Sequence, residues 1–358
     1  MNYTITLLFV FLAVFVHAQT FNLHATEVAP MPEPVSNNVV CEGFIGSTPY
    51  VYSFGGIDTT KMYSGIHLRS FRYNTLTNTW ENLPDLPDTL GKIAPSANRV
   101  GDTIYVIGGY HVFQNGNEVS SNKVHRFNTQ TNLWMSDGTN IPKAIDDQVQ
   151  AVWNDSLIFV VTGWSNSTNV TDVQVYNPVT NSWQTGTPVP NQSVYKLFGA
   201  SGTIIGNMIY YYGGAKTGGS FPAGNTLIKG EINPANPTQI TWTDTILDAT
   251  VKSYRSACTN FYGKAMWLGG ASITYNYNGI AYNGSGGVVP ANQNFHVNAS
   301  LTDWATDIIN LPMDLRGIAH TGEFTRYICG GMETGQQVSN KTYRLTFSYL
   351  TEIKENNK

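Results

Sequence analysis

The sequence predicts an all-β protein made of six similar units, each holding four short strands. Three observations lead to this fold class. Apolar runs that end in two glycines recur along the chain, a turn with asparagine and then a tryptophan follows most of them, and charged residues make up only 12% of the sequence. Soluble domains ordinarily carry about 25% charged residues. The Thr, Tyr, Asn and Gly found in their place suit short strands and turns.

The apolar runs define the length of the repeat. They are Tyr50–Gly56, Ile104–Gly109, Ile158–Gly163, Ile209–Gly214, Ala265–Gly270 and Tyr327–Gly331. Their final glycines lie 53, 54, 51, 56 and 61 residues apart. Glycine allows a tight bend where a Cβ would clash, so we place each run on the second strand of its unit. The third run departs from the pattern, because Thr162 replaces its first glycine and Trp164 follows its second.

The second half of each unit carries a turn and a tryptophan. Trp lies six positions after Asn in four units, as in Asn128 and Trp134, and the fourth unit has a longer loop between Asn233 and Trp242. Asn followed by Thr or Pro is typical of a turn between two strands. An indole supplies much of the core of so small a unit. We expect it to pack on the bare backbone of the glycine pair.

These units must assemble, because a single four-stranded unit cannot bury both of its faces. Placing six units radially around an axis buries the faces and leaves only short edges. The last unit ends near Phe347 without a strand that carries Trp. Phe21–Pro34 resembles the missing strand, so we predict that it forms the outermost strand of the last unit and closes the ring.

The repeated glycine pairs and the Asn-to-Trp spacing resemble the kelch motif, whose repeats are about 50 residues long. The resemblance covers nearly all of the predicted mature chain. It implies a six-bladed kelch β-propeller with four antiparallel strands in each blade. We expect one propeller domain from residue 19 to residue 350, followed by a polar tail at 351–358.

Residues 1–18 are predicted to be a secretory signal peptide. Ile5 to Val16 is almost wholly apolar, and Val16-His17-Ala18 fits a small-residue cleavage site. The run is shorter than the roughly 20 residues that cross a bilayer as a helix. No Lys or Arg precedes it, so an uncleaved anchor helix is the alternative. We predict an exported protein, extracellular or periplasmic, cleaved after Ala18 and without a membrane span.

Three cysteines, Cys41, Cys258 and Cys329, leave at least one without an intramolecular partner. Export permits disulfides. Small buried residues on strands are nevertheless the preferred interpretation. If one bridge forms, ring closure favours Cys41 with Cys329, because it brings their blades together.

The candidate site lies on loops near the axis, where a propeller holds side chains on a rigid scaffold. The loops before the six innermost strands carry four basic residues, and aromatic and acidic side chains lie close by. Together they suit an anionic or hydroxyl-rich ligand such as an acidic sugar. The alternative is solvated loop positions, some paired with Asp146 or Asp147 across the axis. The predicted ligand-binding residues are Lys92, Asp147, Trp164, Lys196, Arg255, Arg316, His320 and Glu333.

Two functions are compatible with these residues. The sequence contains no catalytic constellation, which favours a secreted, monomeric, non-catalytic propeller that binds a glycan or a protein at one face without a cofactor. The chain also resembles bacterial sialic acid mutarotases. That resemblance implies a metal-free isomerase of an acidic sugar such as N-acetylneuraminate, with Arg255, Arg316 and Glu333 on the sugar. Glu333 or His320 would supply general acid–base help.

Other classes fit less well. Galactose-oxidase-like relatives hold copper with two His and two Tyr, and the scattered histidines of this chain do not match that set. We therefore expect no metal. A net charge of −4 and the lack of a long basic run argue against nucleic acid as a partner.

Overall fold

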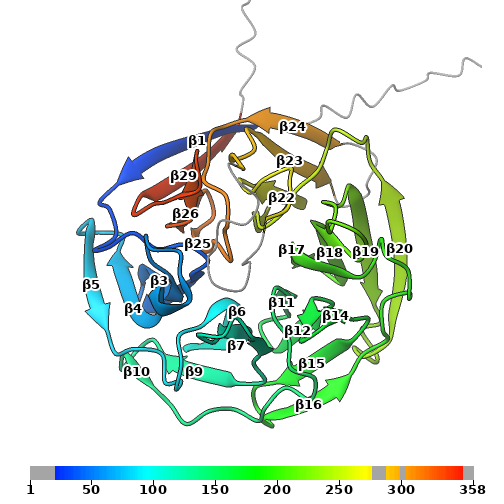
Figure 1. Ribbon diagram of the computed structural model, residues 1–358, viewed down its shortest axis with the longest axis horizontal. Helices are drawn as coiled ribbons and strands as arrows, with labels where there is room; N and C mark the ends of the chain where they lie inside the picture. The colour runs from blue at the N-terminus through cyan, green and yellow to red at the C-terminus, as the bar shows by residue number, and fades with distance from the viewer. Residues whose placement is uncertain (1–20, 276–287, 299–303, 350–358) are drawn as a thin grey trace, which may run out of the picture.

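The computed structural model describes residues 21–275, 288–298 and 304–349. Six four-stranded antiparallel sheets surround a central axis like the blades of a propeller (Figure 1). The predicted all-β, six-bladed propeller is confirmed. The predicted signal peptide (1–18) and the predicted tail (351–358) lie outside the described residues. No helix within the described residues is long and apolar enough to cross a membrane.

In the first three blades the strands follow one another in chain order from the innermost to the outermost. Blade 1 holds β2 (Val39–Ile45), β3 (Thr48–Ile57), β4 (Ile66–Asn74) and β5 (Thr79–Leu83), with the short 3-10 helix η1 (Tyr63–Gly65) before β4. Blade 2 holds β6 (Ile93–Val100), β7 (Thr103–Val112), β9 (Val124–Asn128) and β10 (Leu133–Trp134), and β8 (Glu118–Ser120) pairs with β7. Blade 3 holds β11 (Val149–Trp153), β12 (Leu157–Val161), β15 (Val173–Asn177) and β16 (Ser182–Thr185), beside a hairpin of β13 (Trp164–Ser165) and β14 (Thr168–Asn169).

The other three blades repeat this order. Blade 4 holds β17 (Leu197–Ile205), β18 (Met208–Lys216), β19 (Thr226–Ile232) and β20 (Ile240–Ile246). Blade 5 holds β21 (Ala257–Phe261), β22 (Lys264–Leu268), β23 (Gln293–Asn298) and β24 (Trp304–Ile308). Blade 6 holds β25 (Ala319–Gly322), β26 (Thr325–Cys329), β29 (Thr342–Tyr349) and β1 (Phe21–Val28), beside a hairpin of β27 (Met332–Glu333) and β28 (Gln337–Val338).

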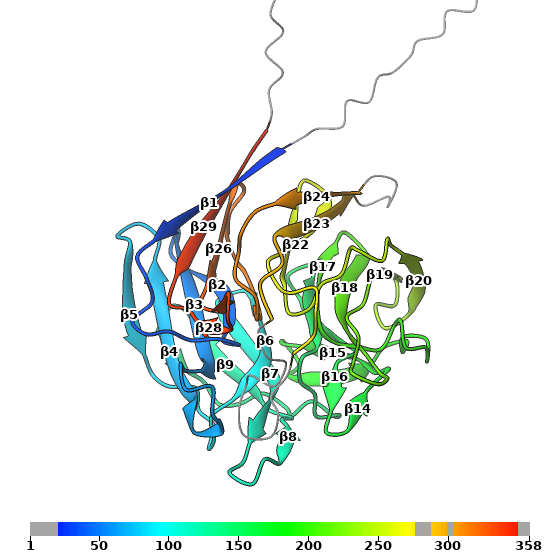
Figure 2. The ribbon, with the colours of Figure 1, turned by 45° about the horizontal axis from the view of Figure 1, so that its top comes forward.

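The first and last strands of the chain close the ring. β1 pairs with β29 in an antiparallel register that runs from Phe21 opposite Tyr349 to Val28 opposite Thr342. The blue β1 and the red β29 lie side by side in both ribbon views (Figures 1 and 2). The predicted N-terminal closure is therefore confirmed, and the outer edge of β29 is covered by a strand.

The glycine pairs have a different partner from the one predicted. A Cβ on Gly109 would lie 2.8 Å from the carbonyl oxygen of Ile93 in its own blade, and one on Gly108 would collide with the carbonyl of Ile145, which leads into the next blade. Both glycines have positive φ angles, 69° for Gly108 and 82° for Gly109. The glycines are needed because two backbone segments approach them, and not because an indole packs on them.

In the first four blades the indole instead joins the blade to the linker that leads into it. Trp134 packs edge-to-face on Phe54 of blade 1, with ring centroids 5.1 Å apart, and its Nε1 donates to the carbonyl of Pro84 at 2.9 Å. Trp80, Trp183 and Trp242 donate in the same way to Ala29, Thr139 and Thr187. The core accordingly lies between neighbouring blades. The three cysteines are free thiols, so the alternative Cys41–Cys329 bridge is not formed.

Candidate functional site in the central channel

A ring of six left-handed residues, which we call the girdle, surrounds the axis. Each stands opposite the second glycine of its blade, before the innermost strand or in its first three residues, and has a φ angle between 47° and 66°. Backbone N–H groups connect neighbours: Asp147 donates to Ala94 at 3.1 Å and Gly199 to Asp147 at 2.9 Å. The girdle consists of Asn37, Ala94, Asp147, Gly199, Arg255 and Asp314.

Arg255 holds the girdle together across the axis. Its Nε and Nη2 donate to the two carboxylate oxygens of Asp147 at 3.1 and 2.5 Å, and Nη1 lies 3.2 Å from Oδ1 of Asp314. All three side chains are buried. Burial raises the pKa of Asp314, while Arg255 and hydrogen bonds from Ser36 and Asn37 oppose that rise. An alternative interpretation of the sequence is pairing with Asp147 across the axis, and Arg255 forms this pair. The pair is buried, whereas that interpretation places such residues in solvent.

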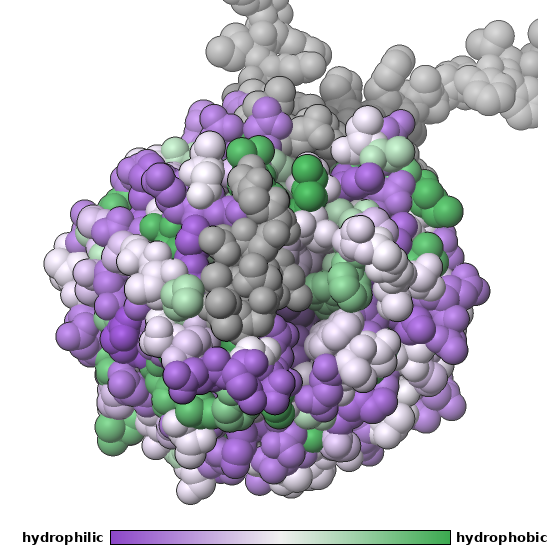
Figure 3. Space-filling view, in the orientation of Figure 1, coloured by the Kyte–Doolittle hydropathy of each residue, from purple (hydrophilic) through white to green (hydrophobic). Residues whose placement is uncertain are grey.

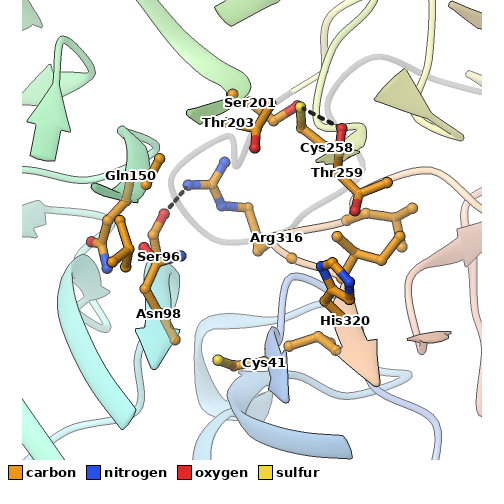
Figure 4. Close-up of a pocket in the computed structure, with 18 of the residues that line it drawn as sticks. Cys41, Ser96, Asn98, Gln150, Ser201, Thr203, Cys258, Thr259, Arg316 and His320 are labelled. Carbon is orange, nitrogen blue, oxygen red and sulfur yellow. Dashed lines mark hydrogen bonds between the residues drawn. The ribbon is translucent and has the colours of Figure 1, made fainter. Parts of the chain in front are cut away.

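The central channel opens beyond the girdle as a cavity of ≈200 Å³. We call it the channel cavity. All six innermost strands or their leading residues line it, and each contributes at least one polar side chain. In Figure 4 the Arg316 side chain extends through the cavity toward Ser96 and Asn98, with Gln150 on the same side. The cavity is therefore polar around its whole circumference.

Arg316 connects the girdle to this cavity. Its Nη1 lies 3.4 Å from Oδ1 of Asp147, and its Nη2 donates to Ser96 Oγ at 2.9 Å and to the carbonyl of Gln148 at 3.1 Å. Burial lowers the pKa of Arg316, and Asp147 opposes this effect. A guanidinium remains charged at neutral pH even so. Arg316 thus provides a fixed cation at the side of the channel.

Four polar atoms of the channel cavity have no hydrogen-bond partner within the described structure. Two are donors, Nε of Arg316 and Nε2 of Gln150, and two are acceptors, Oε1 of Gln148 and Oδ1 of Asn98. Gln148 is 1% exposed and Arg316 is 7% exposed, so bulk water does not reach them freely. Buried polar groups in proteins almost always have partners. This set is therefore arranged for a ligand or for ordered water.

His320 and Glu42 also line the channel cavity. The backbone N–H of His320 donates to Oε2 of Glu42 at 3.1 Å, which ties β25 to β2. The side chain of His320 is exposed to the channel, but neighbouring protein atoms displace much of the water around its imidazole ring. This desolvation, with the charges of Arg326 and Arg99, lowers the pKa of the imidazole to about 4. His320 is accordingly neutral at pH 7.

Lys92 belongs to a buried network between blades 1 and 2, away from the channel. Its Nζ lies 2.6 Å from Oδ2 of Asp88, 3.0 Å from Ser121 Oγ and 3.1 Å from Nε2 of His125. Burial lowers the pKa of Lys92, and the charge of Asp88 opposes this. Asp88 and Ser121 accept hydrogen bonds from this ammonium group. Lys92 lies two residues before the girdle position Ala94, so it is not the counterpart of Asp147 or Arg255 in its blade.

The structure divides the other predicted residues among several places. Arg316 and His320 share the channel cavity, whereas Asp147 and Trp164 line a second cavity on the other side of the girdle. Glu333 pairs with Lys341, with Oε1 and Nζ 2.8 Å apart. Lys196 is half-buried and lines neither cavity. The eight predicted residues therefore do not form one cup.

Sequence reasoning missed Ser96, Asn98 and Gln150. The signal for them is period-two alternation along each innermost strand, since every second side chain faces the axis. Ser96 and Asn98 lie two and four residues after Ala94, whereas Gln150 lies three residues after Asp147, so the position at which the alternation begins also differs between blades. The distance from the girdle residue to the second glycine varies between blades, because the hairpin between the first two strands varies in length. A fixed offset from the glycine pair therefore assigns the wrong residues.

The described residues contain no group of three or more His, Cys, Asp or Glu side chains placed to hold a metal ion. The chemistry available in the channel cavity is hydrogen bonding from amides, hydroxyls and one guanidinium. A neutral imidazole and a carboxylate lie in the same cavity.

Comparisons with known proteins agree with this architecture. A family profile described as the KLHDC2/KLHL20/DRC7 Kelch-repeats domain matches residues 14–214. Kelch-like protein terF of Aspergillus terreus is 24% identical over 257 residues, which make up 70% of this chain and 52% of terF. Kelch-like protein 36 of Rattus norvegicus is 25% identical over 115 residues, 32% of this chain and 18% of that protein. The chain thus spans about half, or less, of the length of these curated relatives.

The solved structure of YjhT has the same architecture. It superposes with a TM-score of 0.69 at 15% sequence identity and covers 90% of this chain and 99% of its own. A likeness at this identity concerns the fold alone.

Proposed function

The chain belongs to the kelch-repeat family, and on this premise we propose that it is a non-catalytic binding module whose channel cavity holds a hydroxyl-rich glycan unit. One observation carries the proposal. Two unpaired donors and two unpaired acceptors line the same cavity, on Arg316, Gln150, Gln148 and Asn98. A sugar hydroxyl both donates and accepts, so one sugar ring can satisfy groups of both kinds.

The energetics favour a polar ligand there. A buried polar group without a partner costs about 1–3 kcal/mol, and a ligand that supplies the partner recovers part of that cost. The cavity of ≈200 Å³ is smaller than the roughly 300–1,000 Å³ of pockets for drug-sized molecules. It therefore suits one sugar unit at the end of a glycan. A carboxylate bonds a guanidinium more strongly than a hydroxyl does, so we expect acidic sugars to bind more tightly than neutral ones.

A glycan array followed by calorimetry tests the proposal. Gln150→Leu keeps the volume of the side chain and removes its amide, and we expect it to weaken the binding of the best glycan about tenfold or more. Gln184→Leu, on the exposed face of β16, is the matched control and should bind like the wild type. If no glycan binds, or if both variants bind alike while thermal unfolding shows them folded, the proposal is wrong.

The mutarotase alternative is tested on the same protein. Opening of a sugar ring requires a general acid and a general base. The imidazole of His320 and the carboxylate of Glu42, which both line the channel cavity, are the candidates for these roles. NMR exchange spectroscopy would follow the anomers of N-acetylneuraminate with and without the protein. We expect no acceleration. An acceleration that disappears in His320→Ala would instead establish the enzyme and overturn the binding-only proposal.

We also propose that the protein acts outside the cytoplasm, where glycans are accessible. The support is the apolar run from Ile5 to Val16 followed by Val16-His17-Ala18, in residues outside the described part of the chain. N-terminal sequencing of the protein recovered from the periplasm or the medium should begin at Gln19. Retention of the full chain in the cytoplasm would refute export and would leave the channel proposal to be judged on binding.

A further inference from the structure

A second cavity, of ≈80 Å³, lies on the other side of the girdle from the channel cavity. Three aromatic rings form one corner of it. Trp164, Phe198 and Phe221 pack with their centroids 5.5–5.7 Å apart and their planes at 67–79° to one another. The rings come from the β13–β14 hairpin, the start of β17 and the loop after β18. Each ring plane is therefore steeply inclined to the other two, so the three rings together form a concave corner. Figure 3 shows a hollow near the axis on the face seen in Figure 1.

Carboxylates line the same cavity. They belong to Glu118, Asp146 and Asp147. Asp147 is paired with Arg255, and Asp146 accepts a hydrogen bond from Ser120 Oγ at 2.5 Å. The carboxylate of Glu118 has no hydrogen bond or ion pair with any side chain that the structure describes. Burial raises the pKa of Asp146 and raises that of Glu118 to about 7, so a cation bound in the cavity would favour the ionised forms of both carboxyl groups.

Tyr110 supplies a further polar group. It lines the cavity, is 3% exposed, and its hydroxyl has no hydrogen-bond partner within the described structure. An unpartnered hydroxyl at such burial is uncommon in proteins. Its position in a cavity with aromatic walls indicates that a bound group completes the site.

We propose that this cavity, which we call the aromatic pocket, binds a methylated ammonium group. Aromatic faces attract cations through the quadrupole of the ring, and cages of several rings with an acidic residue recognise quaternary ammonium groups. The three rings would contact the methyl groups, and Glu118 would face the positive charge. A metal ion is a poorer occupant, because hard cations require a shell of oxygen ligands that the three rings interrupt.

Calorimetry with choline and with its neutral isostere 3,3-dimethyl-1-butanol tests this proposal on the full chain. The two probes have the same shape and differ in one charge. We expect choline to bind about tenfold or more tightly than the alcohol. Equal binding of the two, or no binding of choline at millimolar concentration, would overturn the proposal.

Matched variants locate the site. Phe221→Leu removes a ring and Glu118→Gln removes a charge, and each should weaken choline binding about fivefold or more. Phe113→Leu and Glu231→Gln change exposed residues outside the pocket and should have no effect. If the control variants lose as much affinity as the pocket variants, choline binds elsewhere and the assignment is wrong. Circular dichroism and thermal unfolding establish that each variant is folded.

Two sources can provide this group, a free metabolite or a trimethylated lysine in a peptide. A short peptide with trimethyl-lysine and the same peptide with unmodified lysine distinguish them. Preference for the trimethylated peptide over choline would identify a peptide ligand. The reverse would identify a free metabolite with a methylated ammonium group. Gln150→Leu should leave choline binding unchanged, because Gln150 lines only the channel cavity. The result therefore does not depend on the glycan proposal.

Discussion

Arg255 places its Nη2 atom 2.5 Å from Oδ2 of Asp147, although 108 residues separate the two along the chain. Both side chains are buried at the axis, and the same guanidinium reaches Asp314 of blade 6 at 3.2 Å. The pairing joins blades 3, 5 and 6 through a single side chain. The axis of this propeller is therefore held by charge as well as by backbone hydrogen bonds.

Arg255→Met should destabilise the protein strongly. The substitution leaves the carboxylates of Asp147 and Asp314 buried with less compensation, and removal of one partner of a buried ion pair costs about 3–5 kcal/mol. Urea unfolding would measure the loss. Arg344→Met, at an exposed position of β29, is the control and should change the free energy of unfolding by about 0.5 kcal/mol or less. A loss from Arg255→Met as small as the control's would contradict this account of the girdle.

Asp88 should contribute to stability at neutral pH and lose that contribution in acid. Burial opposes ionisation of Asp88, but the hydrogen bond from His125 and the charge of Lys92 outweigh it and hold the pKa well below its usual range. A carboxyl with a lowered folded-state pKa stabilises above its unfolded pKa of about 4, and the contribution falls as the pH drops below that value.

Scanning calorimetry of wild type and Asp88→Asn measures this effect. The difference in Tm between the two proteins should be large at about pH 6 and shrink at about pH 3. A difference that stays constant over this range would show that Asp88 acts through packing and not through its charge.

Glu118 should act in the opposite direction. Burial and the nearby Asp147 raise the pKa of Glu118 to about 7, against the opposing charge of Arg255. Asp146 and Tyr110 line the same pocket. A carboxyl whose folded-state pKa is raised binds its proton more tightly in the folded protein, so stability falls as the pH rises from about 4.5 to about 7.

Glu118→Gln should remove this dependence. Relative to wild type, the variant should gain in Tm between about pH 5 and about pH 8. Saturating choline should reduce the gain, because a bound cation offsets the cost of the ionised carboxylate. A parallel pH profile for the two proteins would contradict the raised pKa.

Removal of the closing strand should weaken the ring. Deletion of residues 21–28 removes β1, which pairs with β29 along its whole length. It exposes the edge of β29 and opens the last blade, so we expect the Tm to fall by about 5 °C or more. Deletion of residues 351–358, which follow β29, is the control. An unchanged Tm after loss of β1 would show that ring closure contributes little to stability.

The sequence by itself determined the fold of this protein. Six glycine-pair runs and the regular Asn-to-Trp spacing specify four-stranded blades, because turns and strand periodicity are local properties. The closing strand was also predictable, since the last unit lacks a strand and Phe21–Pro34 resembles it. The partners of the glycines were not, because a close approach of Gly108 to Ile145 depends on how two blades meet.

Only the tertiary structure decided the site. Arg316 and His320 share the channel cavity with Ser96 and Gln150, whereas Lys92 faces Asp88 between blades. In a strand, a shift of one residue reverses the direction of a side chain. The hairpins of the blades differ in length, so sequence offsets locate neither the girdle residues nor the side chains that face the channel. Trp164 was visible as a deviation in the third repeat, but its meeting with Phe198 and Phe221 arises from the packing of neighbouring blades around the axis.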